Sequence, residues 1–276
     1  MTGPIPILVY HRIDDKRLST STSPNVFRKH MMWLSRHGWR SLSSDEFAFY
    51  ATRNNTFPCK SFLLTFDDGY RSLATAALPI LQELHFHATC FVATRQIMEE
   101  ANAGEAHDSE ERAFLTWDEV KGLHGSGLID FQSHSHSHRR LREQSEAELT
   151  LDLRISQEVL SNRLALPRSC FRHLAWPWGD ASDSSRAIAE RMGFQFQYTV
   201  ARLAFQHSSS LQHIPRTCYD GATFADFQIQ FWLQSGPLSR PWHAMYPLVR
   251  KLRRPGTVPE AQHAPARDIT PVRKQG

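Results

Sequence analysis

Residues 61–70 read SFLLTFDDGY, an apolar run that ends in two acids, a glycine and a tyrosine. The run from Ser61 to Phe66 predicts a buried strand, because it is short, β-rich and followed by a turn residue. Two adjacent carboxylates repel each other unless they share a cation or a proton, and barrel folds hold their active sites at the carboxyl ends of strands. Side chains alternate along a strand, so one acid can bind a metal while its neighbour faces a substrate. Taken alone, the stretch also fits an acidic surface turn.

Similar apolar runs alternate with segments of helical periodicity along most of the chain, which predicts an α/β protein with a largely parallel sheet. No glycine-rich dinucleotide fingerprint follows a strand, so a (β/α) barrel is favoured over a doubly wound sheet. Ser43, Thr116 and Ser145 each precede a glutamate by three residues, the capping-box spacing that marks a helix start. The other predicted strands are Ile5–Tyr10, Ala88–Ala93, Leu128–Ser133, Cys170–Trp176, Phe194–Val200 and Gln212–Thr217, and the periodic helical segments are Val26–His37, Arg71–Leu84, Glu146–Leu164 and Ser184–Met192.

A histidine-rich tract, SHSHSH at residues 133–138, directly follows one of the predicted strands. Histidines at alternate positions lie on one side of an extended segment, and those four residues apart also approach each other on a helical turn. Such a tract is often a polar loop. Together with a carboxylate, however, two imidazoles leave open positions on a metal, which a hydrolytic centre needs for water and a substrate carbonyl.

A third motif, HLAWPWGD at residues 173–180, ends another apolar run. Proline and glycine around tryptophans form a rigid loop that can aim a backbone N–H at a developing oxyanion and offer an aromatic wall to a sugar ring. The alternative is a pair of core tryptophans at a tight turn between strand and helix.

In combination, the three motifs resemble the NodB-homology polysaccharide deacetylases, carbohydrate esterase family four. That family carries Thr-Phe-Asp-Asp-Gly, then His-Ser/Thr-x-x-His, then an aromatic loop with proline and glycine, in the order found at residues 65–70, 134–138 and 176–179. The opening residues 8–12, LVYHR, and the late residues 214–216, IPR, also resemble a bacterial branch of the family. The resemblance covers residues 5–217 and implies a distorted (β/α) barrel of seven or eight units.

The resemblance also implies a mechanism, the hydrolysis of an N-acetyl group on an amino sugar in a polysaccharide or its precursor. Asp67 is then the general base, and Asp68, His134 and His138 are the ligands of a divalent metal, with Zn²⁺ as the expected ion. His136 is left as a neighbour of the site or an exposed residue. The metal is expected to polarise the amide carbonyl and to lower the pKa of a water molecule from which Asp67 takes a proton.

The substrate contacts that the resemblance implies are Trp178, whose backbone N–H would face the oxyanion, and Arg216. One departure concerns an arginine that many relatives place before the proline-containing loop to pair with the catalytic acid. Ala175 occupies the aligned position here. Arg172 and Arg216 are the two candidates to replace it.

Two histidines are candidates for the general acid, and the sequence does not choose between them. The family motif Leu-x-His matches residues 211–213 and points to His213, while His11, which follows the first strand, competes for the role. Two other functions stay open as well. One is a deformylase or other amide hydrolase on a lipid-linked sugar or a cyclic imide. The other is an inactive carbohydrate-binding relative, which the missing arginine favours and the intact acids and histidines oppose.

The charge of the chain is unevenly distributed. The whole sequence of 276 residues carries a formal charge of +4, but residues 250–276 hold seven basic and two acidic residues, so the first 249 sum to −1. We therefore expect a catalytic domain at residues 1–249, a basic and disordered tail at 250–276, and no nucleic-acid partner. The tail favours weak contact with an anionic membrane surface.

The location is predicted from two further features. The four scattered cysteines are interpreted as reduced core residues, and the first residues lack an export signal. Together they predict a cytoplasmic protein at the inner leaflet.

Overall fold

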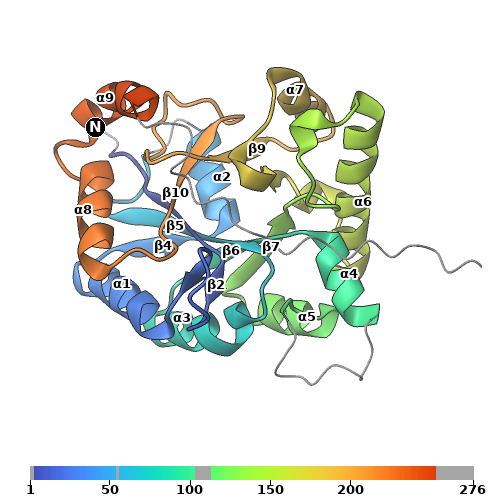
Figure 1. Ribbon diagram of the computed structural model, residues 1–276, viewed down its shortest axis with the longest axis horizontal. Helices are drawn as coiled ribbons and strands as arrows, with labels where there is room; N and C mark the ends of the chain where they lie inside the picture. Colours follow the sequence, from blue (N-terminus) through green and yellow to red (C-terminus); the bar gives the residue numbers. More distant parts are fainter. Residues whose placement is uncertain (1–2, 54–55, 103–112, 253–276) are drawn as a thin grey trace, which may run out of the picture.

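The computed structural model describes residues 3–53, 56–102 and 113–252. Within these ranges, parallel strands form a closed barrel with helices around its outside (Figure 1). The strands follow one another around the ring as β1, β5, β6, β7, β8, β9 and β10, and β10 pairs back onto β1. The predicted distorted (β/α) barrel is thus confirmed. Its strands are β1 (Ile7–Tyr10), β5 (Ser61–Asp68), β6 (Ala88–Val92), β7 (Ile129–Ser133), β8 (His173–Ala175), β9 (Phe196–Val200) and β10 (Ile214–Cys218).

Two irregularities distort the ring. The short strand β4 (Arg40–Leu42), which the sequence pattern did not predict, pairs with residues 61–63 of β5, while β1 pairs with residues 63–66. On the other side, β7 and β8 share a single register pair, Ser133 with Leu174. The small strands β2 (Arg12–Ile13) and β3 (Ser21–Thr22) pair with each other outside the barrel.

The helices agree with the periodic segments at most of their ends. Helix α6 (Glu146–Leu164) has the predicted bounds, and side-chain capping boxes are present at Ser43, Thr116 and Ser145. The segment predicted as one helix from Arg71 instead begins with a π-helical turn at Leu73–Ala77. The other helices are α1 (Pro24–Arg36), α2 (Ser44–Thr52), α3 (Leu78–Leu84), α4 (Thr94–Asn102), α5 (Trp117–Gly125), α7 (Asp183–Arg191), α8 (Phe224–Ser235) and α9 (Ser239–Leu252).

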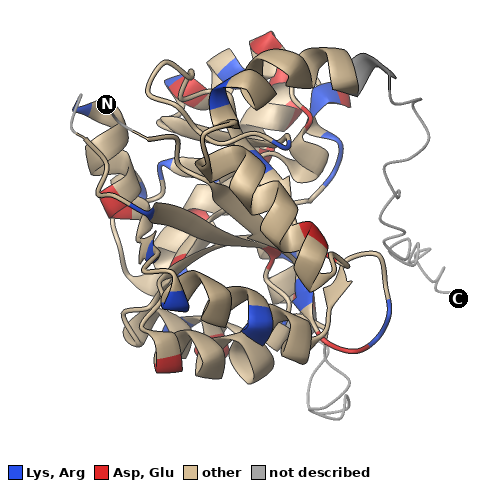
Figure 2. Cartoon of the chain, turned by 90° about the vertical axis from the view of Figure 1, so that its left-hand side faces the viewer, with Lys and Arg blue, Asp and Glu red and all other residues tan. Residues whose placement is uncertain are grey.

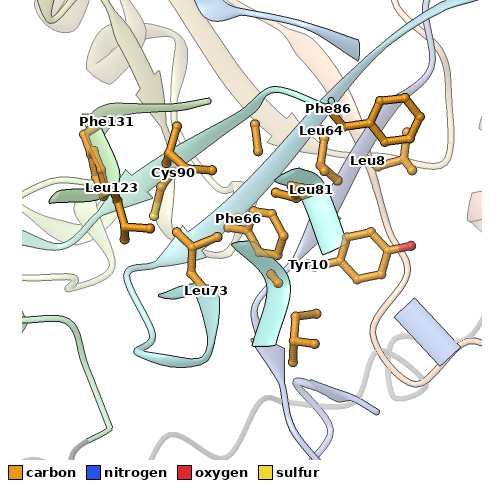
Figure 3. Close-up of a cluster of buried hydrophobic side chains, with 14 of the residues drawn as sticks. Leu8, Tyr10, Leu64, Phe66, Leu73, Leu81, Phe86, Cys90, Leu123 and Phe131 are labelled. Carbon is orange, nitrogen blue, oxygen red and sulfur yellow. The ribbon is translucent and has the colours of Figure 1, made fainter. Parts of the chain in front are cut away.

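Side-chain alternation along the strands divides the core into an inner and an outer part. Leu63 belongs to a buried cluster that includes Ile7, Phe91 and Ile214, all from barrel strands. Its neighbour Leu64 belongs to the larger cluster that packs the barrel against helices, part of which Figure 3 shows. Because Leu63 faces inward, the residues two and four positions later on β5 are directed to the same side.

Two of the four cysteines do not fit the expected core positions. Cys90 is buried within β6 and Cys218 is half-buried, but Cys59 and Cys170 are exposed. Both exposed cysteines lie just before a barrel strand, at the end of the ring opposite the motif loops, where the chain enters the sheet from the surface.

Figure 2 shows that both basic and acidic segments occur on helices and loops in different parts of that view. Helix α9 continues to Leu252, so residues 250–252 are helical although they were assigned to the tail. Residues 253–276, the rest of that predicted tail, lie outside the described residues. Within the described part of the chain, no helix has the length and apolarity needed to cross a bilayer.

Candidate active site

The three motif loops meet at the carboxyl ends of the strands, the end at which barrel enzymes place their chemistry. Four residues with side chains in these loops adopt left-handed backbone conformations: Asp68 (φ 70°), Ser135 (φ 67°), His138 (φ 53°) and Trp178 (φ 55°). Left-handed conformations are unfavourable for such residues and concentrate at functional sites, where the surrounding structure enforces them. At Asp68 this conformation ends the regular alternation of β5, so that both acids can face the same site.

Asp68, His134 and His138 form a cluster whose ligand atoms all lie within 4.8 Å of one another. The Nε2 atom of His138 is 3.0 Å from Oδ1 of Asp68, and Nε2 of His134 is 3.4 Å from the same oxygen. Asp68 is 1% exposed and His134 is 2% exposed. The three residues predicted as metal ligands are therefore brought together in a site that is largely buried from solvent.

The polar atoms of this cluster fit a divalent cation. In the described part of the chain, neither oxygen of the buried Asp68 carboxylate accepts a well-formed hydrogen bond, which is costly unless a cation compensates it. Nδ1 of His134 lies 2.7 Å from the carbonyl oxygen of Ala175 and donates to it, so Nε2 keeps its lone pair. One carboxylate and two imidazoles are a donor set that Zn²⁺ accepts, with positions left open.

The charges of the cluster are coupled. Burial favours the neutral form of Asp68, but the imidazoles of His138 and His134 hold its pKa well below the ordinary range. Burial likewise lowers the pKa of His138, and the carboxylate of Asp68 reverses this effect and raises it. The carboxylate of Asp68 thus favours a positive charge beside it, which a bound divalent cation would supply.

Asp67 lies beside the cluster but has a different partner. Its Oδ1 and Oδ2 each accept a hydrogen bond of 2.7 Å from Nη1 and Nη2 of Arg216, and Nη1 also donates to Oγ1 of Thr65 at 3.2 Å. Oδ2 of Asp67 is 4.0 Å from Nε2 of His134. Burial raises the pKa of Asp67, but the guanidinium of Arg216 prevails and lowers it. Asp67 is therefore held as a carboxylate next to the candidate metal site.

The arginine that replaces the one missing at Ala175 is therefore Arg216. Arg172 instead forms an exposed ion pair of 2.8 Å with Asp45, near the amino end of β8. Arg216 is also fully buried, which disfavours the expected direct contact with substrate. Its Nη1 and Nη2 atoms donate to Asp67 and Thr65 inside the barrel, while its buried Nε atom has no hydrogen-bond partner among the described residues.

His11 and Asp220 form a second pair at the rim. Nδ1 of His11 is 2.5 Å from Oδ2 of Asp220, and the backbone N–H of His11 donates to Oδ1 at 3.1 Å. The register of β1 and β10 pairs Val9 with Cys218, so the residues two positions beyond each of them come side by side. Burial lowers the pKa of His11, but the carboxylate of Asp220 overcomes this and raises the pKa well above 6.5.

His213 lies at the other end of the barrel. It directly precedes Ile214, the first residue of β10, whereas Asp67 and Asp68 are the last residues of β5 and the histidines of the site follow the ends of their strands. Its side chain is 52% exposed and its nearest acid is Asp183, at 3.9 Å. Of the two histidines considered for the general acid, the site thus includes His11 and not His213.

Trp178 stands at the mouth of the site, with 39% of its surface exposed. Its ring centroid is 4.7 Å from that of His138, and the guanidinium of Arg140 lies 5.2 Å from its ring. Gly179 fixes this loop, because a Cβ atom there would lie 2.5 Å from the backbone nitrogen of Val200. A groove of about 660 Å³ extends from here over α6, lined by residues that include His138, Arg95, Arg140, Glu143, Leu151 and Trp178.

His136, the middle histidine of the tract, does not join the metal cluster. Its Nδ1 lies 2.9 Å from Oγ1 of Thr94, and its backbone N–H donates to Asp152 at 2.7 Å. These bonds anchor the loop to α4 and α6.

Asp220 is the residue of the site that the sequence motifs did not indicate. The only available signal was the closure of the first strand on the last one, which places it beside His11.

Comparisons with known proteins agree with this architecture. The family profile described as "Polysaccharide deacetylase" matches residues 54–197. The poly-beta-1,6-N-acetyl-D-glucosamine N-deacetylase of Staphylococcus aureus (strain MSSA476) is 26% identical over 204 residues, which cover 71% of this chain and 67% of that protein. The structure of the Streptococcus pyogenes deacetylase PplD, in complex with acetate, superposes with a TM-score of 0.71 at 23% identity, covering 83% and 99% of the two chains. That of IcaB from Ammonifex degensii gives 0.68 at 21%, covering 85% and 98%.

The profile spans more than half of the sequence, and the fold is shared with the two solved structures. The chain belongs to the polysaccharide deacetylase family. The resemblance seen in the motifs is thereby confirmed, and it extends from the sequence to the barrel itself.

Proposed function

We propose that the protein is a metal-dependent hydrolase that removes N-acetyl groups from an amino sugar in a polysaccharide or its precursor. The observation that carries the proposal is the presence of three units at the same end of the barrel: the Asp68, His134 and His138 cluster, the Asp67 carboxylate, and the His11–Asp220 pair. Amide hydrolysis needs a Lewis acid, a base and an acid within reach of one carbon atom, and the rim offers a candidate for each. The named activity of the S. aureus relative supports the same reaction.

A divalent cation held by Asp68, His134 and His138 would supply Lewis acidity toward a carbonyl oxygen and a water molecule. Asp67 then takes the proton of the attacking water. Its carboxylate is ionised because Arg216 binds both oxygens, and it is not itself part of the ligand cluster. The fixed ion pair also prevents the carboxylate from turning toward the cation, which keeps base and ligand distinct.

His11 is the proposed proton donor to the leaving amine. Asp220 binds its Nδ1 and thereby keeps the imidazole protonated at neutral pH. The charge of His11 acts on the pKa of both Asp67 and Asp68, so it lies within electrostatic reach of the reacting groups. The proposed reaction requires an ionised base and a protonated acid at the same pH. Asp67 and His11 are the residues proposed for these two states.

Trp178 and the adjoining groove are the proposed contact with the sugar. An exposed indole at the mouth of a polar site offers an apolar face to a pyranose ring, and the groove over α6 gives room for further units of a chain. This arrangement favours a polymeric or oligomeric substrate over a single sugar.

The test is acetate release by the metal-loaded protein from N-acetylglucosamine oligomers, nucleotide sugars and lipid-linked sugars, with the Asp67→Asn variant as the matched control. We expect acetate from at least one of these substrates, loss of release after chelation, and recovery on adding Zn²⁺. Formate or a ring-opened acid in place of acetate would identify the alternative amide hydrolases. No product with any substrate, from protein that binds oligosaccharide, would identify a binding relative. The sequence argument for that last function is weakened, because Arg216 supplies the arginine missing at position 175.

Contact with an anionic membrane, and a cytoplasmic location at the inner leaflet, stay proposals. Met245 and Leu248 are exposed on α9, shortly before the basic residues that follow Val249. Flotation with anionic vesicles should therefore be stronger for the full chain than for a chain that ends at Leu252. Equal flotation of both chains would reject a role of the tail.

A further inference from the structure

A second group of metal-ligating side chains lies next to the first. The ligand atoms of His11, Cys218 and Asp220 lie within 4.8 Å of one another. Oδ2 of Asp220 is 2.5 Å from Nδ1 of His11 and 3.2 Å from the Sγ atom of Cys218. The same carboxylate oxygen thus holds an imidazole on one side and a thiol on the other.

We propose that His11, Cys218 and Asp220 form a second metal site, which binds Zn²⁺ or another thiol-seeking cation in excess of the catalytic ion and inhibits the enzyme. The site combines a nitrogen, a sulfur and an oxygen donor, a set that Zn²⁺ accepts, and leaves a further position for water. It differs from the first cluster in having a thiolate, which selects softer cations.

The donors are close enough for a cation to draw them together around itself. Bonds of about 2.0–2.3 Å from Zn²⁺ to nitrogen, oxygen and sulfur require ligand atoms somewhat farther apart than 2.5 Å, so His11 and Asp220 must separate slightly. Nothing covalent holds them, since the two residues lie on loops beyond β1 and β10. The side chain of His11 is 20% exposed, which gives a cation access from solvent.

The second site binds a cation more weakly than the first. A thiol and an imidazole bind a dication through deprotonated atoms, so any proton on Cys218 or on Nδ1 of His11 must leave to solvent. Burial raises the pKa of the Cys218 thiol, and the carboxylate of Asp220 raises it further. A cation at the second site must also break the bonds from Oδ2 of Asp220 to His11 and Cys218. Neither oxygen of Asp68 has a hydrogen-bond partner in the described part of the chain, so the first cluster fills at lower metal concentration.

Inhibition follows if the proposed function is right, because a cation on Nδ1 of His11 replaces the proton that keeps this imidazole a donor. Excess Zn²⁺ is then expected to reduce turnover through the general acid, with the catalytic ion still in place. Metal binding itself does not depend on turnover, so the two proposals can fail separately.

The experiment is a Co²⁺ titration followed by elemental analysis after equilibrium dialysis. We expect a first equivalent without sulfur ligation, then a second that brings a thiolate-to-cobalt charge-transfer band in the near ultraviolet. Cys218→Ser should lose that band and the second equivalent while keeping the first. A Cys59→Ser/Cys170→Ser variant is the matched control, because it removes the two exposed thiols and should keep both equivalents and the band. Excess Zn²⁺ should inhibit this control and spare Cys218→Ser.

The proposal is overturned if the parent protein binds one equivalent only, if Cys218→Ser keeps the band, or if the control loses it. Should Cys218→Ser fail to fold, the parent protein decides the question without a substitution. Excess Zn²⁺ must then protect Cys218 from alkylation, read by mass spectrometry of its peptide, while leaving the exposed Cys170 reactive. Equal alkylation of Cys218 with and without excess Zn²⁺ would reject the site.

Discussion

Arg216 binds both oxygens of Asp67 although its strand is not a neighbour of the strand that carries the acid. β10 pairs with β1 and β9, and β1 separates it from β5, so the guanidinium crosses the interior of the barrel to form two hydrogen bonds of 2.7 Å. The position is set by alternation, since Ile214 and Leu63 share the inner cluster and Arg216 and Asp67 follow them on the same faces. The arginine expected at position 175, the last residue of β8, is thus supplied from β10.

Replacing Arg216 by lysine tests this relationship. An ammonium group offers a point charge and cannot bind both carboxylate oxygens in a plane, so Asp67 loses its fixed orientation. We expect kcat to fall by about 100-fold, a typical contribution of a positioned base, with unchanged metal content. Arg172→Lys is the control and should keep the parent kcat, because its ion pair with Asp45 is exposed. Parent activity in Arg216→Lys would show that the pair has no part in turnover.

Asp67→Asn removes the proposed base but leaves the ligand cluster intact. Loss of the proton acceptor should reduce kcat by about 100- to 10,000-fold. Elemental analysis should find the parent metal content, since the ligand cluster consists of Asp68, His134 and His138. A thermal melt must accompany the assay, because the variant leaves the buried charge of Arg216 without its counter-ion. A folded variant with parent turnover would contradict the assignment of Asp67.

Substitution within the histidine tract distinguishes ligands from neighbours. His134→Ala and Asp68→Ala should each lower the affinity for Zn²⁺ and the metal content of the purified protein. His136→Ala should retain metal, because its ring bonds to Thr94 and not to the cluster. The measurement is zinc per chain after dialysis against a weak chelator. Equal zinc content in His134→Ala and His136→Ala would rule out the proposed ligand set.

The pH profile should be bell-shaped, with limbs that belong to Asp67 and His11. The pKa of Asp67 is lowered by Arg216 against the effect of burial, so activity and the stability of the ion pair are lost only as the pH falls through that depressed value. The pKa of His11 is raised by Asp220, again against burial, so its stabilising contribution is complete below 6.5 and is lost as the pH rises through the raised value.

Asp220→Asn should therefore move the basic limb of kcat/KM to lower pH, while His213→Gln should leave both limbs in place. The comparison separates the two histidines that were considered for the general acid. A basic limb that moves in His213→Gln and stays in Asp220→Asn would reverse the assignment.

Gly179→Ala should disturb the loop that carries Trp178. The left-handed backbone (φ 68°) costs a residue with a side chain about 1–2 kcal/mol, and the added Cβ would also meet the backbone of Val200 at 2.5 Å. Gly193 has a positive φ of 98° but nothing within 4 Å of such a Cβ, so Gly193→Ala shows the backbone cost alone. We expect a larger drop in Tm, and a loss of kcat/KM, for Gly179→Ala. Equal effects of the two variants would show that the contact with Val200 is not limiting.

The barrel strands and the three motifs could be predicted from the sequence because each is local. An apolar run such as residues 61–66 determines its own strand, and DD at its end marks the site without reference to the rest of the chain. The short strand β4 was missed, because three residues carry too little periodicity to be recognised.

The partners across the barrel could not be predicted in this way. Whether Arg172 or Arg216 meets Asp67 depends on which strands face each other, and His213 matched a motif while lying at the wrong end of its strand. Asp220 is 209 positions from His11 and becomes its neighbour only through the register of β1 with β10. Such pairs are determined by ring closure and by side-chain alternation, which a linear pattern does not contain.

Because β10 closes the barrel on β1, a chain under synthesis acquires its metal-ligand residues before it acquires Arg216 and Asp220. Asp68, His134 and His138 all lie before residue 140, so the ligand residues leave the ribosome long before the last strand. Arg216 and Asp220 follow some 80 positions later, which is roughly 4–16 seconds of synthesis at about 5–20 residues per second. An incomplete or truncated chain can therefore carry the metal ligands and still lack a fixed base and a charged proton donor. The residues proposed for hydrolysis are therefore all in place only when the chain is complete and the barrel has closed.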